Sequence, residues 1–356
     1  MTAGNGNAEA YVLLLLGYCS AMPPKLMTMF ADVYKFDRSA VGRLRRAGYL
    51  IDKAFCTEDR RTAHSLRLSQ AGMRKLAEID PVNAQLIEQH PLVPLQGRSA
   101  WLRTKRMHRG AACLYSAVRL GAMFRPVPEK DEAIGKRLVY YTPYEFTRRY
   151  EQDGKAARVN GVFISAQKQY FPVYYLGNQN MAWNPEVETG FRYRFEDSEL
   201  GWGLTYGCDI LIADDWMLAV NLVKQVMNSR SGLIRITDTT RFRMTTLDDC
   251  GLQMLRLTLD ESRLWALGHF LESRTGCPFS TAPDFMFDLG QIERFRPAAN
   301  ASDSYFRPES GSFFSFQIPA MQAIAGEGIE LRSVPAELLT EFFGEHAEQT
   351  AAPDLS

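Results

Sequence analysis

The sequence predicts an α+β (mixed) protein in which a small helical unit with a hairpin precedes a larger domain built on a mixed sheet. The 356 residues are enough for two or three domains, and 46% apolar with 23% charged residues is an ordinary globular composition. Near Arg98 the pattern changes from a run of helices to alternating helices and strands. These observations favour a compact N-terminal unit and a separate α/β domain.

Charge is a third observation, because its sign is divided along the chain. Residues 1–111 hold 17 Lys and Arg against 9 Asp and Glu, a net charge of +8, and the remainder carries −8. A basic N-terminal part and an acidic remainder are expected where one domain binds a polyanion and the other binds a different partner.

The N-terminal unit begins with three predicted helices. The first covers residues 9–20 and is apolar along residues 11–19. That run lacks a basic segment before it and is too short to span a bilayer, so a buried helix is predicted in place of a signal peptide or membrane span. Pro23 and Pro24 suit the first turn of a second helix over residues 24–31. A third helix over residues 39–48 is capped by Asp37 or Ser39 and closed by Gly48.

Two short strands follow, at residues 49–55 and 64–68, around a charged loop that contains Arg60 and Arg61. Ser69 is the expected cap of the next helix. Helix, helix, helix, strand, loop, strand, helix is the order of a winged helix-turn-helix.

The same stretch resembles the winged-helix transcription-factor superfamily at two places. One is Leu44-Arg-Arg-Ala-Gly-Tyr-Leu50, which resembles the passage from recognition helix to wing; the other is Leu66-Arg-Leu-Ser-Gln-Ala-Gly72, which is similar to the L-T-x-x-G exit of the wing. The resemblance implies that the third helix enters the major groove and that the hairpin touches the DNA backbone or minor groove.

Basic side chains on these elements are the candidate DNA contacts, because arginine offers a planar fork to phosphate oxygens or to guanine O6 and N7. The candidate residues are Ser39, Arg43, Arg45, Arg46, Lys53, Arg60, Arg61, Arg103, Lys105 and Arg106. Winged helices also serve as protein–protein modules and dimerisation units, and in that interpretation the basic residues form a solvated face.

A basic bridge separates the two parts of the chain. It contains a predicted helix over residues 101–124 whose first turns are basic and lack acids. Two interpretations stay open: this helix either extends the surface that contacts DNA or is a linker helix with one solvent-exposed face. The predicted division is residues 1–82 for the winged helix, 83–130 for the bridge, 131–345 for the α/β domain and 346–356 for a disordered tail.

The α/β domain is predicted from several buried strands and amphipathic helices. The strand candidates are residues 138–141, 159–164, 170–176, 209–213 and 233–237, and the helix candidates are residues 143–150, 214–228, 259–274 and 335–345. The segment 296–312 reads as a loop.

Over residues 9–240 the layout resembles the replication-relaxation family of plasmid and conjugative-element proteins. The residues that carry this are the two winged-helix passages, the helix beginning near His108, and Ala157-Arg-Val-Asn-Gly-Val-Phe163. In that family the second domain resembles a restriction-endonuclease-like fold related to PD-(D/E)xK nucleases, whose motif reads R-P-D-G-V. Here Asn160 stands where the motif has its acid, which implies a degenerate nuclease-like domain.

Enzyme chemistry finds little support in the pattern. A metal-dependent nuclease of the PD-(D/E)xK type stays as the alternative, with Glu145 interpreted as solvated and the pairs Asp214/Asp215 and Asp248/Asp249 as a helix cap and a turn. The tyrosine pairs at 140/141 and 174/175 are interpreted as sheet packing. No phosphate-binding glycine motif is present, so no cofactor is expected. No pair of cysteines has CxxC spacing and no histidine lies near two of them, so no metal is expected.

The hypothesis from sequence is therefore a non-catalytic, sequence-specific protein that binds double-stranded DNA and serves a mobile genetic element in plasmid replication, relaxation or conjugative transfer. Its other partners would be a relaxase, a replication protein or a second copy of the chain, and no membrane. Six cysteines without CxxC spacing suggest reduced thiols, so a cytoplasmic location is expected.

Overall fold

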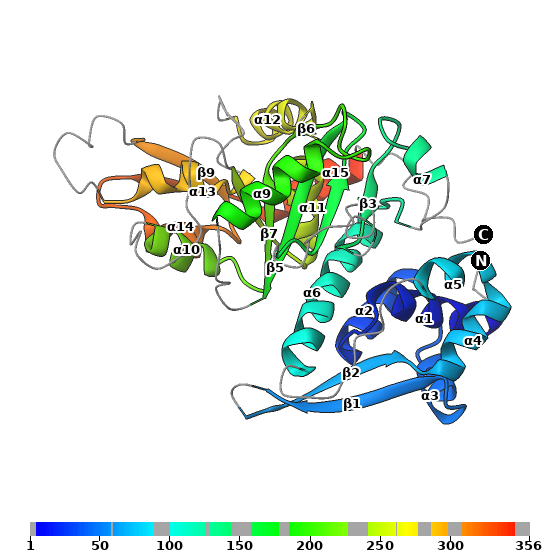
Figure 1. Ribbon diagram of the computed structural model, residues 1–356. Coiled ribbons are helices and arrows are strands. Elements are labelled where there is room, and N and C mark those ends of the chain that lie inside the picture. The colour runs from blue at the N-terminus through cyan, green and yellow to red at the C-terminus, as the bar shows by residue number, and fades with distance from the viewer. Residues whose placement is uncertain are drawn as a thin grey trace.

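The computed structural model describes residues 5–57, 60–88, 100–124, 129–143, 145, 158–177, 185–226, 241–260, 262–276, 286–297 and 308–345. Helices and a mixed sheet are both present, so the protein belongs to the α+β class. An N-terminal unit (residues 5–88) and a sheet region (residues 129–345) lie on either side of one long helix, α6 (Ala100–Arg119), as Figure 1 shows.

The N-terminal unit is built around its first helix. Its elements are α1 (Asn5–Cys19), α2 (Pro24–Tyr34), α3 (Ser39–Arg46), β1 (Leu50–Cys56), β2 (Thr62–Leu68), α4 (Gln70–Ile79) and α5 (Pro81–Glu88). The five residues from Val12 to Leu16 are each at most 5% exposed. A helix that is apolar all round has to be enclosed, and the prediction of a buried helix here is confirmed.

Local signals set the ends of the helices in this unit. The Ser69 hydroxyl accepts a hydrogen bond from the Gly72 amide, 3.0 Å away, at the start of α4. After α3, Gly48 has φ +75°, and the amides of Gly48 and Tyr49 donate to the carbonyls of Arg45 and Leu44. This is the Schellman closure, which needs the left-handed conformation that glycine adopts without strain. Both the cap at Ser69 and the stop at Gly48 agree with the sequence prediction.

The hairpin β1–β2 is antiparallel and regular, with Leu50 opposite Leu68 and Cys56 opposite Thr62. Paired residues share a face. One face carries Asp52, opposite Leu66, and the other carries Phe55. The two faces therefore meet different neighbours, which matters for the arginines of α3.

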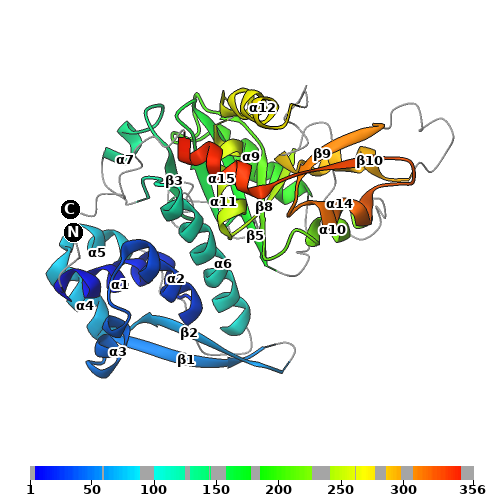
Figure 2. The ribbon, with the colours of Figure 1, turned by 180° about the vertical axis from the view of Figure 1, so that it is seen from behind.

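Helix α6 is the core element common to both regions. From Ala111 to Val118 every residue of α6 is buried. This half packs on β4 and β5 on one side and on α1 and α2 on the other, and Figures 1 and 2 both show α6 between the sheet and the N-terminal helices. Residues 111–118 of α6 are thus enclosed, and its fully exposed residues lie in its first half.

The sheet region holds a six-stranded mixed sheet. Its strands are β3 (Val139–Tyr141), β4 (Gly161–Ile164), β5 (Gln169–Gly177), β6 (Thr205–Tyr206), β7 (Asp209–Ala213) and β8 (Phe242–Thr246). The order is β3-β4-β5-β7-β8, with β6 beside β5; β3, β4 and β5 run antiparallel, and β5, β7 and β8 are parallel. The adjacent tyrosines 140 and 141 belong to the cores on opposite faces of the sheet, as expected for strand residues.

Helices cover both faces of this sheet. The first cover consists of α9 (Pro185–Glu196) and α10 (Leu218–Val226), and the second of α6 and α11 (Asp249–Leu259). Figure 1 shows α9 in front of the sheet, and Figure 2 shows α6 and α11 in front of it. The remaining elements are α7 (Glu129–Glu132), α12 (Ser262–Thr275), α13 (Leu289–Ile292), η2 (Glu293–Phe295), β9 (Ser310–Phe314), α14 (Ile318–Ile324), β10 (Glu330–Val334) and α15 (Ala336–Glu345). β9 and β10 form a separate parallel pair.

Several boundaries differ from the sequence prediction. The helix expected over residues 259–274 is α12, which begins later, at Ser262, because α11 ends at Leu259 and Asp260 accepts hydrogen bonds from Ser262 and Arg263. Helix α11 itself was not predicted. The helix expected from residue 214 begins at Leu218. The strand expected at 233–237 and the tail 346–356 lie outside the described residues. None of the helices in the described part of the chain combines the length and apolar composition needed to cross a membrane.

Candidate nucleic-acid interface

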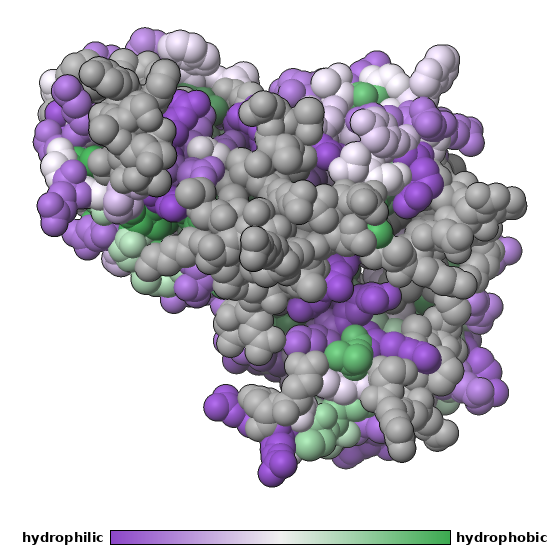
Figure 3. Space-filling model, turned by 60° about the vertical axis from the view of Figure 1, so that its left-hand side comes forward, coloured by the Kyte–Doolittle hydropathy of each residue, from purple (hydrophilic) through white to green (hydrophobic). Residues whose placement is uncertain are grey.

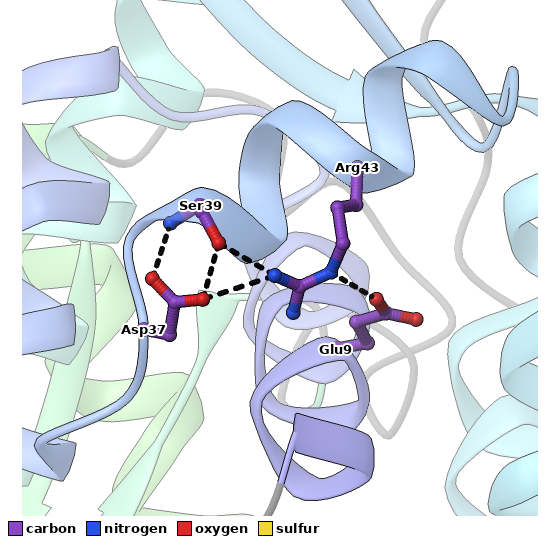
Figure 4. Close-up of polar contacts among 4 residues, drawn as sticks. All are labelled: Glu9, Asp37, Ser39 and Arg43. Atoms are coloured by element: carbon purple, nitrogen blue, oxygen red, sulfur yellow. Dashed lines mark hydrogen bonds and ion pairs between the residues drawn. The ribbon is translucent and has the colours of Figure 1, made fainter.

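The start of α3 is organised by two acidic residues (Figure 4). The Asp37 carboxylate accepts hydrogen bonds from the Ser39 amide, at 2.8 Å, and from the Ser39 hydroxyl. Arg43 Nη1 lies 2.9 Å from Asp37 Oδ2, and Arg43 Nε lies 2.9 Å from Glu9 Oε1 on α1. Hydrogen bonds from Ser39 and then Arg43 lower the pKa of Asp37 to about 2, so this carboxylate is charged at neutral pH. Arg43 therefore ties α3 to α1.

The outward face of α3 lies opposite its buried residues. Ala40 and Leu44 are buried against the unit, and at helical spacing the opposite side carries Ser39, Gly42 and Arg46. Arg46 is exposed, and no ion pair to it is found among the described residues. The structure thus places Arg46 on the open side of the helix.

Gly42 is at the centre of this outward face. A Cβ added there would meet only Arg46 Nη1, at 3.8 Å. Glycine within a helix costs about 1 kcal/mol relative to alanine, and packing inside the unit does not require it. Glycine is also the residue that lets another molecule approach a backbone closely.

Arg45 lies on the flank of α3 that faces the hairpin. Its Nη1 is 3.1 Å from Asp52 Oδ2 on β1. The other oxygen of Asp52, Oδ1, lies 3.0 Å from His64 Nδ1 on β2. This chain of three side chains joins α3 to both strands of the hairpin.

The end of the hairpin presents two exposed arginines. Thr57 and Arg61 close the turn, since the Thr57 amide donates to the Arg61 carbonyl at 2.8 Å and the Thr57 hydroxyl accepts from the Arg61 amide at 3.0 Å. Arg60 has φ +60°, an uncommon conformation for a residue with a side chain. Residues 58 and 59 lie outside the described part of the chain.

The opposite face of the hairpin is braced by the first half of α6. The rings of Phe55 and Trp101 lie 5.8 Å apart, and His108 Nε2 lies 2.9 Å from Ser65 Oγ. Burial lowers the pKa of His108 to about 4, so His108 is neutral at physiological pH. Lys53 is on this face, with its Nζ 5.6 Å from the centroid of the Phe55 ring. The structure therefore places Lys53 toward α6 and away from the Arg45 side of the hairpin.

The predicted basic residues of α6 lie in the same first half of the helix as the bracing residues. Arg103 and Arg106 are exposed, and Lys105 is half-buried. They follow Trp101 by two to five positions, and at helical spacing Arg103 and Arg106 lie on the side of α6 away from Trp101 and His108. The first half of α6 thus carries basic side chains as well as the contact with the hairpin.

The acids considered for a nuclease have structural partners. Asn160, where the nuclease-like motif has an acid, is buried, and its Oδ1 accepts from the Tyr175 amide at 2.8 Å. Glu145 was expected to be solvated, and this is wrong: its side chain is 12% exposed and lies 2.6 Å from the buried Lys130. An ammonium group enclosed by protein needs such a counter-charge. Asp248 caps α11 through the Gly251 amide, at 2.8 Å.

A buried polar layer between α9 and the sheet was not predicted. Glu188 accepts from the Tyr174 hydroxyl at 2.9 Å and from the Arg158 amide at 3.0 Å. Asp209 is 1% exposed, and burial raises its pKa to about 7, against the opposing influence of Arg192. A lone acid at a strand start has no sequence signal that reveals this enclosure. Within the described ranges, no group of three or more His, Cys, Asp and Glu side chains could hold a metal ion.

Comparison with known proteins identifies no relative, because no family model, no curated protein and no solved structure matches the chain. The charge and exposure of the surface residues are therefore the basis for a functional proposal. On the face that Figure 3 shows, hydrophilic residues prevail wherever described residues are visible, and apolar residues form small separate spots. The resemblance to the replication-relaxation family stays a prediction.

Proposed function

We propose that this protein binds double-stranded DNA through its N-terminal unit, which acts as a winged helix-turn-helix with α3 in the major groove and the β1–β2 hairpin as the wing. The observation that carries the proposal is the exposure of four arginines on these two elements. They are Arg45, Arg46, Arg60 and Arg61. Arginine at such positions suits both phosphate and base contacts.

The length of the hairpin fits this mode of binding. Its strands are seven residues long, which corresponds to about 23 Å at roughly 3.3 Å per residue. Half a turn of DNA is about 17 Å. With α3 in one groove, the exposed arginines at the hairpin end would therefore reach the backbone beside the neighbouring groove.

Not every predicted contact has the same role in the proposal. Arg43 lies between Glu9 and Asp37, so its positive charge is compensated, and we assign it to holding α3 at its angle. Lys53 faces α6. Arg103, Lys105 and Arg106 on the first half of α6 would extend the footprint beyond the hairpin, because the braced contact between α6 and the hairpin keeps the two in a constant arrangement.

The setting that we propose is a mobile genetic element, with the protein acting as a non-catalytic accessory or regulator in plasmid replication, relaxation or transfer. This part rests on the resemblance of residues 9–240 to the replication-relaxation family. The chain outside the first 111 residues carries a net charge of −8, which makes it unsuited to a second polyanion. We assign it to protein contacts, with a relaxase, a replication protein or a second copy.

The test is fluorescence anisotropy of the full chain with a random duplex of about 30 bp and with DNA that flanks its own gene, across a salt series; this length covers two half-sites. Affinity that falls steeply with salt, and a preference for the flanking DNA, are the expected results.

Matched variants locate the interface. Arg46→Ala and Arg60→Ala should each weaken binding and reduce the salt slope by about 1, as loss of one phosphate contact does. Arg194→Ala, which removes an exposed arginine from α9, is the control and should change neither quantity. Absence of binding at low salt, or equal effects in all three variants, would contradict the proposal.

A further inference from the structure

The three arginines of α3 are held in three different ways, and the difference concerns what each can bind. Arg43 lies between two carboxylates, those of Glu9 and Asp37. Arg46 has no ion pair among the described residues. Arg45 is intermediate, since its Nη1 contacts a single acid, Asp52, at 3.1 Å.

Asp52 is built to hold its neighbours in place. Its side chain is 15% exposed, whereas those of Arg45 and His64 are 52% and 54% exposed. Each of its two oxygens has its own partner, with Oδ2 facing Arg45 and Oδ1 facing His64 Nδ1. The carboxylate therefore sits beneath an exposed guanidinium group and limits the rotamers that this group can adopt.

We propose that Arg45 reads a guanine base in the major groove and that Asp52 is the positioning residue that orients it. The inference rests on the proposed function, because it requires α3 to enter the groove. The Asp52 contact uses Nη1, which leaves the donors on Nε and Nη2 for a ligand. Two neighbouring N–H donors match the paired acceptors O6 and N7 of guanine.

Charge favours a base over a phosphate at Arg45. A phosphate oxygen next to this guanidinium group would also lie near the negative Asp52 carboxylate, and like charges at short range repel. The acceptors of guanine carry no net charge and avoid this repulsion. Arg46 has no ion pair with an acid among the described residues and is the better phosphate ligand. In the proposal, Arg45 therefore contacts a base and Arg46 contacts a phosphate.

Orientation before binding adds to the effect. An arginine side chain has many rotamers, and a side chain that is already restrained loses less conformational entropy on binding. Asp52 supplies that restraint from the hairpin, so α3 and the hairpin jointly determine the direction in which Arg45 points.

The experiment first selects bound duplexes from a randomised library with the full chain. Each guanine of the selected site is then replaced, one at a time, by 7-deazaguanine, which has a C–H group in place of N7. One replacement should weaken wild-type binding by about 10-fold, within the range of a bidentate base contact. Arg45→Ala should bind the guanine and 7-deazaguanine duplexes equally, while Arg46→Ala should still distinguish them.

Asp52→Asn tests the positioning role with a readout that a purely structural role would not produce. It should lose the guanine preference and bind random DNA more tightly, because it removes a negative charge next to the groove. Asp32→Asn is the matched control, since Asp32 pairs with the exposed Arg38; it should keep the guanine preference. A loss of both specific and random binding in Asp52→Asn would mean that Asp52 only stabilises the hairpin.

Two outcomes overturn the inference in distinguishable ways. Binding of DNA with no position sensitive to 7-deazaguanine, or with the same sensitivity in Arg45→Ala, removes the role of Arg45 and leaves the proposed function intact. Failure of the wild-type chain to bind any duplex removes both.

Discussion

The N-terminal unit and the sheet region use charged side chains in opposite ways. In the α3–hairpin part Arg45, Arg46, Arg60 and Arg61 are exposed, and Asp52 lies beneath Arg45. Between α9 and the sheet, the acids Glu188 and Asp209 are themselves buried, with tyrosine and backbone partners for Glu188. Exposed charge retains its hydration and is available to a ligand, whereas a buried carboxylate pays a desolvation penalty and serves the structure. The comparison therefore separates a surface suited to binding from a polar layer that belongs to the fold.

The largest effect is expected from α6, where the two regions meet. Leu114 is 1% exposed within the core shared by α1, α2 and the sheet. Leu114→Ala should destabilise the protein by about 2–5 kcal/mol through lost burial and a cavity. Urea unfolding followed by far-UV circular dichroism and by tryptophan fluorescence should show one coincident transition moved to lower urea. Two separated transitions would mean that the regions fold independently and that α6 does not unite them.

The next effect tests the buried acid of the sheet region. Burial raises the pKa of Asp209 from 3.8 to about 7, so the folded state binds a proton that the unfolded state has released between these values. The contribution of Asp209 to stability should therefore be fully present below about pH 4 and should be lost as the pH rises to about 7, by on the order of 4 kcal/mol at most. In Asp209→Asn this part of the pH dependence should be absent.

Urea midpoints between pH 4 and pH 8 measure the difference. The comparison of wild type with Asp209→Asn isolates this residue from other titrating groups, because they are common to both proteins. Parallel pH profiles for the two proteins would show that Asp209 is not the source, and that the polar layer is more hydrated than its burial implies.

The smallest effect is expected at Gly42 on the outward face of α3. Gly42→Ala should raise stability by up to about 1 kcal/mol, because alanine favours the helix and its Cβ would meet only Arg46 Nη1 at 3.8 Å. If α3 enters the groove as proposed, the same Cβ would also project toward the DNA and weaken its binding several-fold. Thermal unfolding and anisotropy measure the two quantities. A variant that is more stable and binds DNA as well as the wild type would show that DNA does not lie close to α3 at Gly42.

The elements of the N-terminal unit could be predicted because their signals are local. Ser69 caps α4 through a residue three positions away, and Gly48 ends α3 through amides next to it. The apolar run within α1 likewise predicts its own burial. In the sheet region the strands β4, β5 and β7 were recognised from apolar runs, whereas α9, α11 and β8 were missed, and the helix predicted over residues 259–274 is α12.

The candidate site could be predicted only as a set of residue types. The sequence determined that arginines would cluster on α3 and at the end of the hairpin, and that α3 would turn Ala40 and Leu44 inward. Helical spacing alone cannot say which arginine has an acid beside it. The partner of Arg43 on α1 is 34 positions away in the chain, and that of Arg45 lies on the next element.

Tertiary structure decided the rest, for a physical reason. Caps, turns and periodicity act over a few residues, so they can be recognised in the amino-acid sequence. Ion pairs, enclosure and exposure depend on which surfaces come together after the chain has folded, and their energies depend on the surrounding dielectric. The sequence by itself determined that this protein has a basic helical unit joined to an acidic α/β region. The folded structure alone decided that Arg43 lies between two acids, that Arg45 contacts one acid and that Arg46 has no ion pair among the described residues.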